Sequence, residues 1–206
     1  MLGTLLGKAA IVAGGAIAAG IALGVAIERR RSARARSFGE LPSRPEFHVR
    51  VASSRDVPQI SAFVLELARF EELVHEVVLG TEQMRGDFAA GHFECLLAEH
   101  DGQPAGMALF FHNYSTFEGL SLYLEDLYVS PEYRGRGCGK LLLQSVASVA
   151  RHRRCARLQW QALSWNEKAV TFYKALGARE RVDGETTWLN FIMGSREIAN
   201  LAGGAA

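Results

Sequence analysis

The sequence predicts one α/β domain with a mixed central sheet and flanking helices, preceded by a hydrophobic N-terminal helix. Three observations support this class. Short segments rich in Val, Leu, Tyr and Phe alternate with segments whose apolar residues recur every three or four positions. Two strand-like segments flank an Asp-Gly turn, which is typical of antiparallel pairing. A glycine-rich loop separates another strand from a helix, as in layered α/β proteins.

The composition narrows the class of function. The chain has 206 residues, of which 49% are hydrophobic, and a formal net charge of +1. This length suffices for one well-buried domain plus an appendage, and so small a charge does not favour binding to nucleic acid. Three cysteines, Cys95, Cys138 and Cys155, fit neither a disulfide framework nor paired metal ligands. We therefore expect reduced thiols and no metal site.

The appendage comprises residues 1–36. No residue from Ala9 to Ile27 is charged, and an arginine-rich stretch follows at once. A helix of this length approaches the thickness of a bilayer core, and the cationic flank would keep the rest of the chain in the cytosol. Three interpretations stay open: a single-pass membrane anchor, a cleaved organellar or secretory leader, and an extension without a membrane role.

Residues 37–45 have two prolines and little apolar content, and are predicted as a linker. The compact domain is predicted over residues 46–194, with a tail over 195–206. It begins with a strand at 46–52, where apolar and polar residues alternate. Asp56 can cap a following helix, and Thr81 a second, shorter one. Apolar residues near helical spacing support the first of these helices: Ile60, Val64, Leu67 and Leu73.

The rest of the domain is predicted to alternate further strands and helices. Strands at 93–99 and 104–114 flank the Asp-Gly turn, and a further strand spans 122–130. After the glycine loop we expect a helix at 140–154, a strand at 156–163, a helix at 166–178 that Gly177 closes, and a final strand at 186–192.

The glycine loop, YRGRGCGK at residues 133–140, matches neither of two common phosphate motifs. A P-loop would need a glycine at Arg134 and Ser or Thr at Leu141, and a dinucleotide fingerprint would need a glycine at Lys140. Between a strand and a helix, however, Gly137 and Gly139 let successive N–H groups point into one concavity beside the positive end of the helix. We expect a pyrophosphate cradle, with a purely structural turn as the alternative.

Two longer motifs carry a family resemblance. LEDLYVSPEYRGRGCGKLLL and WNEKAVTFYKALGA resemble the acetyl-CoA-binding core of the GNAT N-acetyltransferase superfamily. The segments VRVA, LELARFEE and FECLLAE extend the resemblance to the diamine acetyltransferase family, over residues 47–192. It implies the GNAT acyl-CoA N-acyltransferase fold, a homodimer, and direct transfer of acetyl from acetyl-CoA to a primary amine of a small diamine or polyamine.

The resemblance also implies the acetyl-CoA contacts. Backbone groups of Leu127, Tyr128 and Val129 would hold the pantetheine arm. Asn166 matches a cofactor-contacting asparagine, although the residues alone favour a helix cap; the two roles are compatible. The pyrophosphate would lie against the loop residues Arg134, Gly135, Arg136, Gly137, Cys138, Gly139 and Lys140.

Two residues match catalytic positions of the family. Tyr173 matches the proton donor that would protonate the departing CoA thiolate, whereas the residues alone favour core packing beside Phe172. Glu125 matches the glutamate that relays a proton from the amine. Such a relay is needed because only about one alkylammonium in 2,500 is a free amine at pH 7. Glu125 and Asp126 are adjacent on a strand, so we expect only Glu125 to line the cleft.

Phe70, Glu71 and Glu185 match acceptor-binding positions suited to a cationic amine. Ser115 departs from the polyamine acetylators, which resemble this chain but have Asp there. Thialysine acetyltransferases, with Ser at this place, are therefore an alternative, as is acetylation of protein amines. An alternative from another functional class is a membrane-tethered module that binds acyl-CoA without catalysing a reaction. The presence of both Glu125 and Tyr173 argues against it, because binding alone requires neither residue.

Overall fold

The computed structural model describes residues 37–180 and the single positions 193, 198 and 201. The chain divides into two compact units, residues 1–161 and 162–206. The run from Ala9 to Ile27, Glu185 and the strand predicted at 186–192 lie outside the described residues. Among the helices that are described, none combines the length and the apolar character needed to cross a membrane.

The first unit contains a five-stranded sheet in the order β1-β2-β3-β4-β5. All neighbours are antiparallel except β4 and β5, which are parallel, so the predicted mixed sheet is confirmed. The β2–β3 turn places Asp101 (φ 50°) and Gly102 (φ 75°) in the left-handed region, which explains the Asp-Gly pair. The strands are β1 (His48–Val51), β2 (Glu94–His100), β3 (Gln103–Ser115), β4 (Gly119–Val129) and β5 (Arg157–Gln159).

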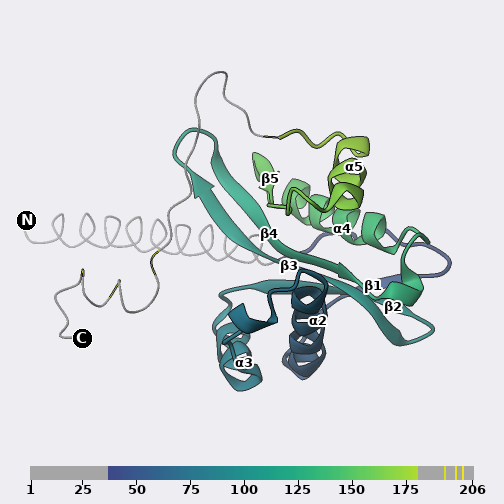
Figure 1. Ribbon diagram of the computed structural model, residues 1–206. Coiled ribbons are helices and arrows are strands. Elements are labelled where there is room, and N and C mark those ends of the chain that lie inside the picture. Colours follow the sequence, from purple (N-terminus) through teal and green to yellow (C-terminus); the bar gives the residue numbers. More distant parts are fainter. Residues whose placement is uncertain (1–36, 181–192, 194–197, 199–200, 202–206) are drawn as a thin grey trace, which may run out of the picture. The chain divides into compact units, whose positions relative to one another are not determined.

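Helices cover both faces of this sheet. Helices α2 (Val57–Phe70) and α3 (Thr81–Ala90) lie on one face, and α4 (Cys138–His152) lies on the other (Figure 1). Helix α2 buries Ile60 and Phe63 in a core shared with β2, β3 and β4. On α4 most of the buried residues recur every three or four positions, which gives one mainly apolar stripe against the sheet: Cys138, Leu141, Leu142, Ser145, Val146 and Val149.

Two details of the first helices differ from the sequence prediction. Helix α2 ends at Phe70, so Leu73 lies in the turn that follows and is 37% exposed, because Glu72 turns the chain with a positive φ of 61°. Gly80 is the N-cap of α3, and Thr81 is its first helical residue. The hydroxyl of Thr81 instead lies 3.0 Å from that of Ser61 on α2, which joins the two helices.

Residues 37–47, which precede β1, contact β3 and the C-terminus of α4 within the first unit. The ring of Phe38 packs edge-on against that of Phe110, with 6.4 Å between the ring centroids. The guanidinium of Arg153 stacks on the Phe38 ring, 5.0 Å from its centroid. Arg153 has a fully buried side chain that binds both carboxylate oxygens of Glu94 at 2.6 Å and donates to the carbonyl of Ser37. The buried arginine thus connects the C-terminus of α4, strand β2 and this segment.

The second unit contains α5 (Glu167–Ala175). The Asn166 side chain accepts a 3.2 Å hydrogen bond from the N–H of Ala169, so the predicted cap is confirmed. Gly177, with a φ of 88°, donates its N–H to the carbonyl of Lys174 and closes the helix as predicted.

Candidate active site

Strand β4 continues past the end of its partner β5. The parallel pairing ends where Tyr123 lies opposite Gln159. Beyond this point, residues 124–129 of β4 have no strand partner on that edge among the described residues. Main-chain N–H and C=O groups need hydrogen-bond partners, so an open edge of this kind can bind an extended ligand in the manner of an added strand.

A β-bulge lies at the start of the open edge. Leu109 of β3 faces Asp126, whereas its neighbour Phe110 faces Leu124, so Glu125 is an extra residue without an opposite partner. A bulge bends its strand and increases the local twist. The bulge begins two residues after the last β4 residue that pairs with β5, and the side chain of Glu125 is exposed there.

The glycine loop follows the open edge directly. Gly135 and Gly137 have φ values of 75° and 88°, a region that side chains disfavour, and Gly137 is the N-cap of α4. The N–H groups of the first turn of α4 have no acceptor within the helix and carry the positive end of its dipole. Helix α4 begins beside β4: a Cβ atom placed on Gly139, in the first turn of the helix, would lie only 3.6 Å from Val129 Cγ2 on the strand. The geometry suits an elongated ligand that ends in phosphate.

Two arginines of the loop are held by the protein itself. Arg134 donates from Nε to the carbonyl of Val129 at 2.8 Å and stacks on the rings of Phe70 and Tyr128, at 5.3 and 5.7 Å. Arg136 donates to His100 Nε2 at 2.9 Å and lies 3.6 Å from a carboxylate oxygen of Glu46. Both guanidinium groups thus have partners within the chain.

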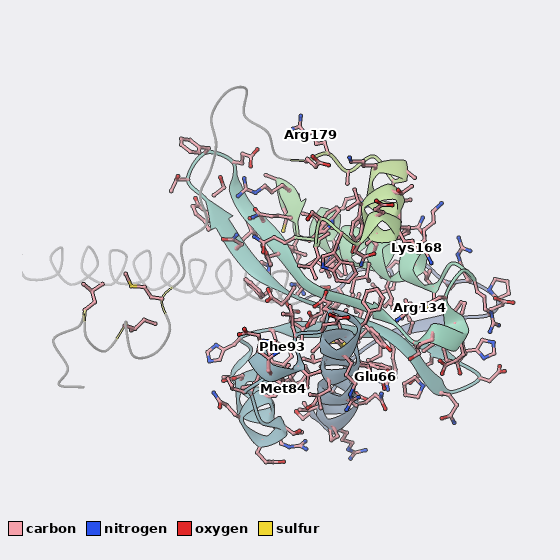
Figure 2. All side chains as sticks on the ribbon, viewed as in Figure 1. Glu66, Met84, Phe93, Arg134, Lys168 and Arg179 are labelled. Atoms are coloured by element: carbon pink, nitrogen blue, oxygen red, sulfur yellow. The ribbon has the colours of Figure 1, made fainter. Side chains whose placement is uncertain are left out.

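The side chain of Tyr128 faces α2. Its hydroxyl donates a 2.6 Å hydrogen bond to Glu66, and burial together with this bond raises its pKa to about 12. Figure 2 labels Glu66 on α2 and Arg134 on the loop, and both contact Tyr128. Only the main chain of Tyr128 is therefore left for the ligand that the sequence predicts there.

Three acidic side chains gather where α2 ends and β4 bulges. Burial raises the pKa of Asp126 to about 7, and the negative charges of Glu125 and then Glu71 add to this shift. Burial also raises the pKa of Glu71, which directly follows Phe70 at the end of α2. Phe70 itself is 43% exposed and can contact a ligand. The predicted acids Glu71 and Glu125 thus lie in one electrostatic cluster.

Sequence reasoning missed the part that Asp126 takes in this cluster. It expected only Glu125 to line the cleft, whereas Asp126 is half-buried beside Glu125 and Glu71. A carboxyl group with a pKa near 7 exchanges protons readily at neutral pH. The sequence held one signal for this burial. Side chains alternate between the two faces of a strand, so Asp126 lies on the same face as Tyr128.

The remaining predicted residues are placed as follows. Tyr173 lies on α5 in the second unit, partly exposed, with its ring centroid 5.2 Å from that of Phe172. Ser115 is buried at the β3–β4 turn, where its hydroxyl accepts from the N–H groups of Phe117 and Glu118 at 3.3 and 3.2 Å. In the described part of the chain, no group of three or more metal-ligating side chains could hold a metal ion.

The comparisons with known proteins agree with this geometry. Residues 62–178, which include β4, the glycine loop and α5, match the Acetyltransferase (GNAT) family. The chain is a GNAT acetyltransferase. Enzymes of this family use acetyl-CoA. The glycine loop and open strand edge of this chain fit such a molecule, which has a pyrophosphate and an extended pantetheine arm.

Individual proteins show which kinds of acetyltransferase this chain is similar to. A thialysine N-epsilon-acetyltransferase of Mus musculus is 38% identical over 165 residues, which cover 75% of this chain and 96% of the relative. A spermidine/spermine N(1)-acetyltransferase-like protein 1 of Homo sapiens is 28% identical, and the match covers 24% of that protein. A solved integron cassette protein of V. cholerae matches 76% of this chain with a TM-score of 0.59 and 22% identity, which shows the shared fold.

Proposed function

We propose that this GNAT acetyltransferase transfers acetyl from acetyl-CoA to the side-chain amine of thialysine or of another lysine-like amino acid. The observation that carries the proposal is the open edge of β4, which joins the acidic cluster of Glu71, Glu125 and Asp126 to the N-terminus of α4. One end of this edge suits a cationic amine, and the other suits the phosphates of acetyl-CoA.

The acidic cluster has two tasks in this proposal. Its negative charge favours binding of an alkylammonium group. The amine must then lose a proton before it can attack, and Asp126, whose pKa is about 7, can accept that proton directly or through Glu125. Glu125 is exposed at the bulge and lies between the ligand and the buried acid in this proposal.

Tyr173 completes the reaction. The attacking nitrogen forms a bond to the acetyl carbon, the C–S bond breaks, and the phenol of Tyr173 donates a proton to the CoA sulfur as it leaves. Asn166 caps α5 and so fixes the start of the helix that carries Tyr173. These roles rest on the positions that match the family.

Two observations favour a lysine-like acceptor over a polyamine. The thialysine acetyltransferase of Mus musculus matches over nearly its whole length, with higher identity than the spermidine/spermine acetyltransferase-like protein. Ser115 uses its hydroxyl to close the β3–β4 turn, and no acid stands there to hold a distal ammonium. A homodimer and a membrane anchor through residues 9–27 remain further parts of the proposal.

The test is thiol release from acetyl-CoA by the full chain, with thialysine, lysine, putrescine, spermidine, spermine and a lysine-containing peptide as acceptors. We expect the highest kcat/KM for thialysine. A preference for spermidine or spermine would move the chain to polyamine acetylation, and no release despite CoA binding would make it a non-catalytic module. Tyr173→Phe should lower kcat about 100-fold while CoA affinity is retained; unchanged kcat would remove the proton-donor role.

A further inference from the structure

A third arginine reaches the glycine loop from outside the part of the chain that matches the family. Arg44 lies in the segment before β1, whereas the match begins at residue 62. Its guanidinium lies over Gly137, the N-cap of α4. The position that a Cβ atom would occupy on Gly137 is 2.5 Å from Nη1, 3.1 Å from Cζ and 3.7 Å from Nη2 of Arg44. A Cβ atom on Gly137 would displace the end of the Arg44 side chain, and the φ of 88° independently favours glycine at this position.

Arg44 is held in place by its main chain. Its N–H donates to the carbonyl of Phe47 at 3.4 Å, and the N–H of Phe47 donates to the carbonyl of Arg44 at 3.3 Å. Phe47 is 1% exposed, so this tight turn is anchored in the core. Pro45 stands inside the turn and restricts the backbone further.

The side chain of Arg44 differs from those of Arg134 and Arg136. The guanidinium of Arg134 is hydrogen-bonded to the carbonyl of Val129, and that of Arg136 is paired with His100 and Glu46. No carboxylate among the described residues forms an ion pair with Arg44, and its side chain is exposed. A cation without an acidic partner therefore lies beside N–H groups that lack acceptors. Both would be satisfied by the same anion.

We propose that Arg44 binds the pyrophosphate of acetyl-CoA together with the first turn of α4. The planar guanidinium can donate two parallel hydrogen bonds to phosphate oxygens, while the backbone N–H groups donate from the other side. This inference rests on the proposed acetyl-CoA site and adds a residue to it. The segment before β1 thereby becomes part of the cofactor site rather than a mere linker.

The test compares Arg44→Ala, Arg44→Lys and the unchanged full chain in calorimetric titrations with CoA, 3′-dephospho-CoA and pantetheine. Dephospho-CoA retains the pyrophosphate, and pantetheine has no phosphate. We expect Arg44→Ala to weaken CoA and dephospho-CoA about tenfold each and pantetheine not at all. Arg44→Lys should restore part of the loss, because it keeps the charge without the fork. Arg151→Ala, an exposed arginine in the last turn of α4, is the matched control and should change nothing.

Other results would overturn the inference. An unchanged CoA affinity would show that Arg44 makes no phosphate contact, and a tighter one would show that it blocks the cradle. A loss for CoA but not for dephospho-CoA would assign it to the 3′-phosphate instead. An equal loss for pantetheine would indicate a structural role. If the unchanged chain fails to bind CoA, the proposed function fails; normal binding with no acetyl transfer leaves the Arg44 contact intact.

Discussion

Replacing Asp126 by Asn should make the protein more stable at alkaline pH and flatten the pH dependence of its stability. In the folded chain the pKa of Asp126 is about 7, raised from 3.8 mainly by burial and then by Glu125 and Glu71. Between these two values the folded state holds a proton that the unfolded state has released. Stability contributed by this proton is fully present below pH 3.8 and is lost as the pH rises through 7.

The magnitude follows from the size of the shift. Each unit of pKa difference corresponds to about 1.4 kcal/mol, so a shift of roughly three units is worth about 4 kcal/mol between pH 4 and pH 8. Asn has nearly the shape of the protonated acid and does not ionise. The free energy of unfolding of Asp126→Asn should therefore exceed that of the unchanged chain at pH 8 and match it near pH 4.

Urea unfolding followed by circular dichroism at pH 4, 5, 6, 7 and 8 would measure this difference. Asp101→Asn is a matched control, since Asp101 is 91% exposed in the β2–β3 turn and Asn suits that turn equally well. Glu125→Gln removes one charge that raises the pKa of Asp126, so it should move the transition to lower pH. Equal pH slopes for Asp126→Asn and the unchanged chain would refute the argument, because Asp126 would then titrate near its ordinary value.

Two further predictions concern α4. Arg153→Met should lower the free energy of unfolding by about 3–5 kcal/mol, because Glu94 would keep a partly buried charge without its fully buried partner; Arg151→Met, at an exposed position, should change it by less than about 0.5 kcal/mol. Urea unfolding measures both, and similar losses would contradict the ion-pair argument. Burial raises the pKa of the Cys138 thiol to about 11, so native Cys138 should react with iodoacetamide far more slowly than the half-buried Cys155. Peptide mapping after a timed reaction measures the two rates, and faster labelling of Cys138 would show that the glycine loop opens.

Much of the fold could be predicted because its signals are local. The Asp-Gly turn, the cap at Asn166, the closing Gly177 and the apolar stripe of α4 each depend on residues a few positions apart. The error at Leu73 has the same origin. The spacing of Leu73 continues the apolar pattern of α2. The helix nevertheless ends at Phe70 and the chain turns at Glu72, and the apolar periodicity does not indicate such a turn.

The candidate site was predicted in part for the same reason. The glycine loop is contiguous, so its composition indicated a phosphate cradle, and the family motifs pointed to Glu125 and Tyr173. The pKa of Asp126 was beyond reach, because it depends on the burial of one strand position and on charges that include Glu71 at the end of a distant helix. The bulge at Glu125 likewise depends on how β3 and β4 pair.

The sequence by itself thus determined the order of the strands and helices within residues 46–178, the glycine loop and the resemblance to GNAT acetyltransferases, since each depends on neighbouring residues. Only the tertiary structure decided that β4 continues beyond the end of β5, that Arg134 and Arg136 are already paired, and that Arg44 lies over Gly137. The physical reason is that these features arise from packing between segments far apart in the chain. Burial and charge at such contacts are properties of the folded molecule and of no single segment.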